Sequence, residues 1–168
     1  MHIRTFHPSD LPGLVDLTIE VFGPFFEQSF RTMVPPDVYQ HQHGHWADDY
    51  RASVPKLHDP EQGKQVAVAE SGAGQLAAYV AWDIDLERRH GHLELLAVRE
   101  SHRRSGLGRA LCEHAISAMR EHPLEVVSVG TGGDWFHAPA RALYASMGFH
   151  PVPVVYYLQA LQGGDRRR

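Results

Sequence analysis

Three apolar runs follow one another in the middle of the chain, and they constrain the fold more than any other feature. VAVAE (66–70) and QLAAYVAWDID (75–85) flank the turn-forming tetrapeptide SGAG, which is typical of an antiparallel hairpin. The third run, HLELLAV (92–98), follows the charged loop LERRHG. These runs predict three consecutive strands of one sheet.

The N-terminal part of the chain predicts a strand, a helix and then a less regular segment. A strand over residues 2–6 leads into a helix that the Ser-Asp pair at 9–10 can cap, and apolar side chains recur there at helical spacing. The Gly-Pro pair at 23–24 is expected to end this helix. Residues 25–60 are expected to be irregular and rich in aromatic residues and histidine, with a helical piece over residues 46–54.

The C-terminal part predicts two helices alternating with two strands. An apolar stripe predicts a helix over residues 107–121, and it is followed by a strand over 126–130. HAPARALYASMGF predicts a helix with proline in its first turn, and VVYYLQAL (154–161) a last strand. Residues 1–161 are therefore expected to form one α/β domain, a mixed and mostly antiparallel sheet flanked by helices. Residues 162–168 are expected to be a disordered tail.

Composition narrows the classes of partner. The 168 residues, 43 % of them hydrophobic, suit a single globular domain. A formal charge of -4 does not favour nucleic acid or an anionic membrane, and a cationic small molecule is the easier partner. The one cysteine, Cys112, excludes an internal disulfide and lacks an adjacent base, so a packed side chain in a reducing cytoplasm is expected. No signal peptide and no run of about 18 apolar residues is seen.

A glycine-rich turn, RRSGLG (103–108), joins the third apolar run to the following helix. Gly106 and Gly108 allow the backbone to approach a ligand, and the helix start offers unpaired N–H groups that suit a pyrophosphate. No Gly-Lys-Ser/Thr follows, so the turn is not a Walker A loop, and Leu111 replaces the third glycine of a dinucleotide fingerprint. A plain strand-to-helix connection stays open as an alternative.

Two motifs in order carry a family resemblance. RRSGLG after a strand resembles the acyl-coenzyme A motif Q/R-x-x-G-x-G/A of the GNAT N-acetyltransferases, and ARALYASMGF resembles the second family signature, a tyrosine-bearing helix that ends in Gly-Phe. The resemblance covers nearly the whole chain. It implies acetyl-coenzyme A as cosubstrate and a bulge in the strand before the motif. The cofactor residues that it implies are Leu96, Ala97, Val98, Arg103, Arg104, Ser105, Gly106, Leu107, Gly108, Arg109, His137 and Tyr144.

The resemblance also implies catalytic roles. Tyr144 matches the family tyrosine that protonates the sulfur of coenzyme A, and the backbone N–H of Val98 or Ala97 would polarise the thioester carbonyl. His137 stands where the family often has asparagine. For the base, strict alternation places His92, Glu94 and Leu96 on one face of the strand, and Glu94 acting through water is preferred to His92. The alternative is that Glu94 has a structural role and pairs with an arginine on a neighbouring strand.

The acceptor is less constrained than the cofactor. Carboxylates are expected along the acceptor cleft: Asp48, Asp49, Asp83, Asp85, Glu87 and Glu94. They favour a cationic small-molecule amine as acceptor, and an aminoglycoside is one candidate. A peptide or protein amine, or a sensor that binds acyl-coenzyme A without turnover, remains an alternative. The histidines of HQHGHW (41–46) lack adjoining acidic or thiol ligands, so no metal is expected. Family members often form homodimers through their last strands, and VVYYLQAL offers such a strand.

Overall fold

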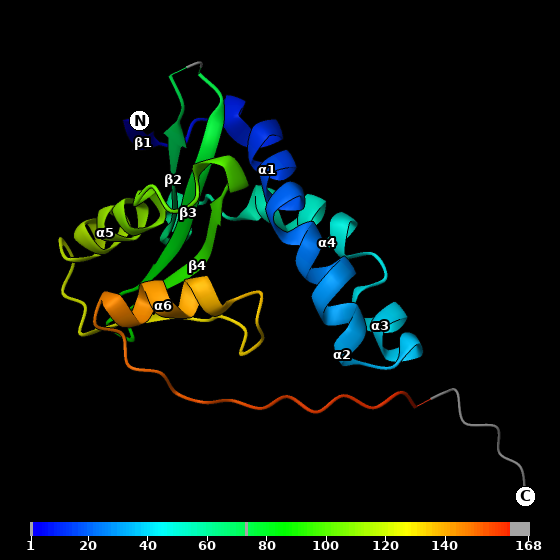
Figure 1. Ribbon diagram of the computed structural model, residues 1–168. Coiled ribbons are helices and arrows are strands. Elements are labelled where there is room, and N and C mark those ends of the chain that lie inside the picture. The colour runs from blue at the N-terminus through cyan, green and yellow to red at the C-terminus, as the bar shows by residue number, and fades with distance from the viewer. Residues whose placement is uncertain (1, 73, 162–168) are drawn as a thin grey trace, which may run out of the picture.

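The computed structural model describes residues 2–72 and 74–161. Within those residues the chain forms a five-stranded sheet in the order β1-β2-β3-β4-β5. Figure 1 labels β1 to β4 of this sheet. β1 to β4 pair antiparallel, whereas β4 and β5 are parallel. The strands are β1 (His2–Thr5), β2 (Lys64–Glu70), β3 (Leu76–Asp85), β4 (His90–Val98) and β5 (Val126–Val129). The mixed, mostly antiparallel sheet predicted from the sequence is confirmed.

Different helices cover the two faces of the sheet. Leu93 and Leu111 belong to the buried cluster on the face of α5 and α6, and Tyr79 and Leu17 to the cluster on the face of α1. The central strands are apolar on both sides because alternate side chains enter the two clusters. The helices that position the site are α1 (Leu11–Pro24), α5 (Leu107–Met119) and α6 (Ala138–Ser146).

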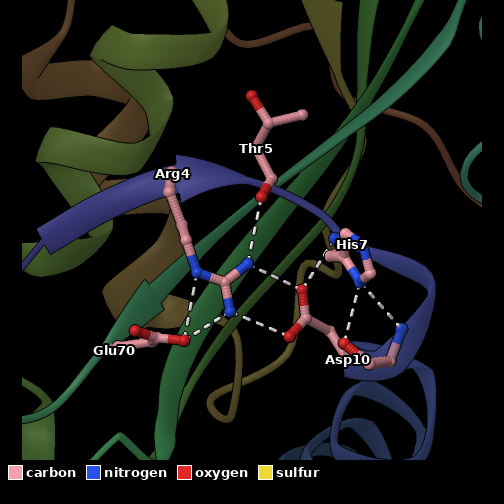
Figure 2. A network of polar contacts seen from close by, with 6 residues as sticks. Arg4, Thr5, His7, Asp10 and Glu70 are labelled. Carbon is pink, nitrogen blue, oxygen red and sulfur yellow. Dashed lines mark hydrogen bonds and ion pairs between the residues drawn. The ribbon is translucent and has the colours of Figure 1, made fainter.

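Arg4 ties β1 to β2 and to the start of α1, as Figure 2 shows. Its guanidinium donates to both carboxylate oxygens of Asp10 at 2.8 Å, and its Nε donates to Glu70 at 3.0 Å. Asp10 also accepts the backbone N–H of His7 at 2.7 Å, within the 3₁₀ turn η1 (Pro8–Asp10). The hydrogen bond from Arg4 is the main reason that the pKa of Asp10 lies below its ordinary value. Asp10 stands at the N-cap position of α1, but its side chain does not cap that helix. Its carboxylate is bonded instead to Arg4 of β1 and to the turn before α1.

The segment after α1 is helical, so the prediction of an irregular stretch was wrong. The helical path does not end at Pro24 but continues into a π-helix, because the packed rings of this segment outweigh the one backbone donor that proline removes. Phe26 stacks on Trp46 with ring centroids 5.1 Å apart, and Trp46 Nε1 donates to Glu27 at 2.9 Å. The predicted helix over residues 46–54 is confirmed by α4. The elements of this segment are η2 (Phe25–Phe30), α2 (Arg31–Met33), α3 (Pro36–His43), α4 (Trp46–Ser53), η3 (Val54–Lys56) and η4 (Pro60–Gln62). Of the helices described, none has the length and apolar character needed to cross a membrane.

The predicted last strand is also wrong, since residues 154–161 are described without a strand. Figure 1 shows this segment running extended from the end of α6, away from the sheet. Tyr156 and Tyr157 are 88 % and 92 % exposed. Valine and tyrosine favour strands, but a strand forms only where a neighbour pairs its N–H and C=O groups. The expected tail, residues 162–168, lies outside the described residues.

Candidate functional site

A β-bulge in β4 falls at Glu94. Leu93 and Leu95 pair with successive residues of β3, which leaves Glu94 without a partner across the ladder. Leu93 packs on the side of α5 and α6, whereas Leu95 packs on the side of α1, so the bulge reverses the alternation of side chains. The prediction that Leu96 shares a face with His92 and Glu94 is therefore wrong, because Leu96 packs toward α5 and α6.

Beyond this bulge, β4 and β5 separate. Their parallel pairing begins at His90 with Val126 and runs to Leu93 with Val129. After Val129 the chain enters a loop that leads to α6, while β4 continues to Val98. One edge of the second half of β4 is thus directed toward α6 and its preceding loop instead of toward a strand.

The backbone of β4 presents alternate residues to this open edge. Arg99 donates its N–H to the carbonyl of Ala77 on β3 at 2.9 Å. In an antiparallel pair, successive residues direct their N–H and C=O groups to opposite edges. Leu96 and Val98 therefore direct theirs to the open edge, and Ala97 directs its own to β3. The prediction that Ala97 offers its backbone groups to a ligand is therefore wrong.

The turn between β4 and α5 adopts the left-handed backbone conformation twice. After the 3₁₀ turn η5 (Glu100–His102), Arg104 has φ 63° and Gly106 has φ 83°. Within the described part of the chain, the backbone N–H groups of Arg104, Ser105 and Gly106 make no hydrogen bond. Those of the first turn of α5, from Leu107 on, have no partner inside the helix. The turn and the helix start together present a row of N–H donors that can bind an anion.

Gly108 brings the first turn of α5 close to its neighbours. A Cβ atom at Gly108 would lie 3.6 Å from the side chains of Val98 on β4 and Leu143 on α6. Leu107 is buried beside it. The row of donors is therefore held against the open edge of β4.

The arginines of the turn are partly engaged with the protein. Arg103 Nε donates to the carbonyl of Val98 at 3.2 Å, and Arg109 donates to Ser146 Oγ at 2.6 Å. These contacts place both side chains beside the turn, and Arg103 and Arg104 are exposed to solvent. Positive charge therefore surrounds the row of donors, as an anionic ligand requires.

A cleft of about 440 Å³ opens beside Arg103. α1 lines one side with Glu20 and Pro24, and the loop before α6 lines the other with Trp135 and Phe136. Trp135 is 66 % exposed, which leaves a large aromatic surface at the mouth of the cleft. The cleft and the open edge of β4 both adjoin the turn, so an elongated ligand with a phosphate group has room to extend from it.

Tyr144 of α6 lies within the apolar cluster on the same side of the sheet. The residue is 9 % exposed, and its ring lies 6.0 Å from that of Phe149, centroid to centroid. Burial raises the pKa of the Tyr144 hydroxyl, and the neighbouring Cys112 thiol adds to this effect. The hydroxyl therefore stays protonated at neutral pH and can act as a proton donor. Burial also raises the pKa of Cys112, to about 12, in agreement with the packed role expected of it.

His137 is oriented by an aspartate that the sequence reasoning missed. Asp134 Oδ2 lies 2.6 Å from His137 Nδ1, and Asp134 Oδ1 accepts the backbone N–H of Phe136 at 2.9 Å. Burial acts to raise the pKa of Asp134, but the hydrogen bonds and charge of His137 outweigh it and the pKa is lowered. The ring of Phe25 lies 4.6 Å from that of His137. Nδ1 is thus committed to Asp134, and Nε2 is the ring atom left for another contact. The signal was an aspartate in the loop just before a Pro-containing helix, where its carboxylate can accept backbone N–H groups two and three residues further on.

A row of polar side chains crosses the sheet on the face of α1. Asp83 of β3 pairs with His92 of β4, and His92 pairs with Ser128 of β5. His92 Nδ1 lies 2.8 Å from Ser128 Oγ, and His92 Nε2 lies 3.6 Å from Glu94 Oε2. The structure therefore brings His92 and Glu94 together. Ser128 was missed, although it is the one polar residue of the strand VVSV.

The histidines of HQHGHW do not form a cluster. His41 and His43 belong to α3, in which residues two positions apart face different directions. The ring of His43 packs on Phe30 at a centroid distance of 4.6 Å, and burial lowers its pKa. Among the described residues, no group of three or more His, Cys, Asp or Glu side chains is placed to hold a metal ion.

Comparison with known proteins places this geometry in a family. The family model described as "Acetyltransferase (GNAT) family" matches residues 24–149. The N-acetyltransferase YsnE of Bacillus subtilis (strain 168) is 25 % identical over 112 residues, which cover 61 % of this chain and 74 % of YsnE.

Two solved structures share the fold. A mutant of the BH1408 protein from Bacillus halodurans superposes with a TM-score of 0.69 at 19 % identity, over 96 % of this chain and 100 % of that one. The aminoglycoside antibiotic 6'-N-acetyltransferase of Acinetobacter haemolyticus gives 0.67 at 19 % identity, over 96 % and 100 %. Because the family model spans most of the sequence, this chain belongs to the GNAT family of acetyltransferases.

Proposed function

We propose that the protein is an acetyl-coenzyme A-dependent N-acetyltransferase that acetylates a primary amine by direct transfer. The observation that carries the proposal is the open edge of β4 beside the donor row of residues 104–108. A pyrophosphate suits the donor row, and the pantetheine arm is an extended chain of amides that suits an unpaired strand edge.

Individual residues would hold the cosubstrate in distinct ways. The N–H groups from Arg104 to Gly108 would bind the pyrophosphate, with Arg103 and Arg109 alongside. Backbone groups of Leu96 and Val98 would bind the pantetheine amides. Acetyl-coenzyme A supplies the thioester when bound, and the N–H of Val98 would polarise its carbonyl.

Two side chains would move the protons. Glu94 would accept a proton from the acceptor amine through water, and Tyr144 would give its proton to the departing thiolate. The bulge supports the first role, because it frees Glu94 from the ladder and leaves its side chain 52 % exposed. Burial supports the second, because it keeps the hydroxyl of Tyr144 protonated.

The acceptor is proposed to be a cationic small molecule. Asp83 lies opposite His92 on β3 and Glu94 lies 3.6 Å from its ring, so two carboxylates meet here against one lysine, Lys64, opposite Asp83. Other carboxylates expected at the cleft are partly neutralised, since Asp48 pairs with Arg51 at 2.7 Å. The aminoglycoside acetyltransferase of the same fold supports testing an aminoglycoside first.

Thiol release tests this function and its acceptor class together. Acetyl-coenzyme A would be incubated with the protein and, in turn, an aminoglycoside, a linear polyamine, a peptide with a free N-terminus and a lysine peptide. We expect amine-dependent release for the polycations and a fall in kcat of about 100-fold in Glu94→Gln, with Glu121→Gln, at an exposed residue just after α5, as the unaffected control. Release with the peptides alone would reassign the acceptor. Binding without release for every amine would favour the sensor alternative.

We also propose a homodimer built on the C-terminal segment, residues 150–161. This segment exposes Val152, Tyr156 and Tyr157 to solvent. β5 pairs with β4 along one edge, and in the described residues its other edge carries no strand. Exposed apolar side chains and an unpaired strand edge both favour association.

A further inference from the structure

His92 is held between a hydroxyl and a carboxylate that come from different strands. Its Nδ1 lies 2.8 Å from Ser128 Oγ on β5, and its Nε2 lies 3.6 Å from Glu94 Oε2 at the bulge of β4. The first distance is that of a hydrogen bond, and the second is longer than one, so Glu94 acts on Nε2 through its negative charge. The two nitrogens of one ring are therefore assigned to two different partners.

The partners decide which nitrogen carries the proton of the neutral ring. An ionised carboxylate accepts hydrogen bonds and cannot donate, so its proximity favours a proton on Nε2. Nδ1 must then be an acceptor and needs a donor. A serine hydroxyl is such a donor, because its O–H can rotate to suit the ring.

The surroundings of His92 offer no better partner for Nδ1. Asp83 lies opposite His92 on β3, and Lys64 lies opposite Asp83 on β2, which completes the polar row on this face. Asp83 is a carboxylate and cannot donate to Nδ1 while ionised. Among the described residues, Ser128 alone lies within hydrogen-bond distance of the ring.

We infer that Ser128 is a positioning residue: it donates its hydroxyl to Nδ1 of His92 and so holds the Nε2–H toward Glu94. The ring then restrains the carboxylate that the bulge has freed from the ladder. The base remains Glu94, which takes the proton of the amine, and His92 and Ser128 orient it without exchanging protons with the substrate. The catalytic consequence rests on the proposed function, whereas the tautomer of His92 does not.

A pair of isosteric variants separates the hydroxyl from the shape of the side chain. Ser128→Thr keeps a hydroxyl and Ser128→Val replaces it with a methyl group, and both β-branched residues suit a strand. We expect kcat with the best amine to fall roughly tenfold in Ser128→Val and to stay within about twofold in Ser128→Thr, with KM for acetyl-coenzyme A unchanged in both. Equal effects of the two variants would show a packing role and overturn the inference.

The tautomer is measured independently of activity. Long-range ¹H–¹⁵N correlation spectra of ¹⁵N-histidine protein, with His92→Gln to assign the signals, report which nitrogen of His92 is protonated. We expect Nε2 protonated and Nδ1 hydrogen-bonded in the parent and Ser128→Thr proteins, and the Nδ1 signal shifted to that of an unbonded nitrogen in Ser128→Val. A proton on Nδ1 in the parent protein would contradict the inference. If the spectra are as expected but no amine is acetylated, the tautomer of His92 is confirmed and the proposed function is refuted.

Discussion

At the scale of single residues, Tyr144 combines a packed ring with a hydroxyl whose pKa is raised by burial. Tyr144→Phe keeps the ring against Phe149 and removes the hydroxyl, so we expect kcat to fall about 100-fold while the melting temperature changes little. Steady-state kinetics and thermal unfolding check this. Tyr50→Phe is the matched control, because burial also raises the pKa of Tyr50, to about 12, but this half-buried residue lies in the aromatic segment after α1. A parallel loss of activity in both variants would remove the special role of Tyr144.

Asp10 carries a prediction about acid stability. Its pKa is lowered in the folded protein from an ordinary value of 3.8, so its stabilisation is fully present above that pH and is lost as pH falls through the folded pKa. Asp10→Asn should lower the free energy of unfolding by about 1 kcal/mol at pH 7, and the difference should shrink below pH 3.8. Urea unfolding at several pH values measures it. The exposed Asp16 on α1, as Asp16→Asn, should show neither effect.

At the scale of elements, the two glycines of the turn differ in their backbone. Gly106 has φ 83°, whereas Gly108 lies in α5, where a Cβ would make ordinary contacts at 3.6 Å. Gly106→Ala should therefore lower the free energy of unfolding by about 1 kcal/mol, and Gly108→Ala should change it by less than about 0.5 kcal/mol. Chemical denaturation of the two variants checks this. Equal destabilisation would mean that crowding, not backbone conformation, governs the turn.

Elements with strong periodicity were the ones that could be predicted from the sequence. Two apolar runs around a turn-forming tetrapeptide predicted the hairpin of β2 and β3, and the apolar stripe predicted α5. The bulge at Glu94 could not be found in this way, because one extra residue in the ladder leaves composition and propensity unchanged. The resemblance implied it, and its position reversed the face of Leu96.

Long-range packing explains the remaining differences. Proline at residue 24 suggested a helix end, but rings far apart in sequence, such as Phe26 and Trp46, hold the chain helical beyond it. Ser128 joins the candidate site through a contact with His92, far away in the sequence, that no local pattern encodes. Asp134 differs, because its histidine lies only three residues further along the chain. By contrast, Arg103 to Gly108 form a contiguous motif, so the sequence alone predicted their common location.

At the scale of the whole molecule, the exposed C-terminal segment predicts self-association. Sedimentation velocity at micromolar concentration should give a dimer for the full chain and a monomer for the double variant Tyr156→Asp, Tyr157→Asp. The reason is that charge would disfavour burial of residues that are about nine-tenths exposed in the isolated chain, at 88 % and 92 %. Leu86→Asp, which alters an exposed residue of the loop between β3 and β4, is the control. A monomeric full chain would refute the dimer.

Calorimetric titration of acetyl-coenzyme A into the purified protein tests the central claim most directly. We expect one site per chain with a Kd in the micromolar range, weaker binding in Arg103→Ala, and no comparable binding of ATP, which lacks a pantetheine arm for the edge of β4. Absence of binding at near-millimolar acetyl-coenzyme A, or equal binding of ATP, would contradict the account and leave RRSGLG as a connecting turn or a general nucleotide site.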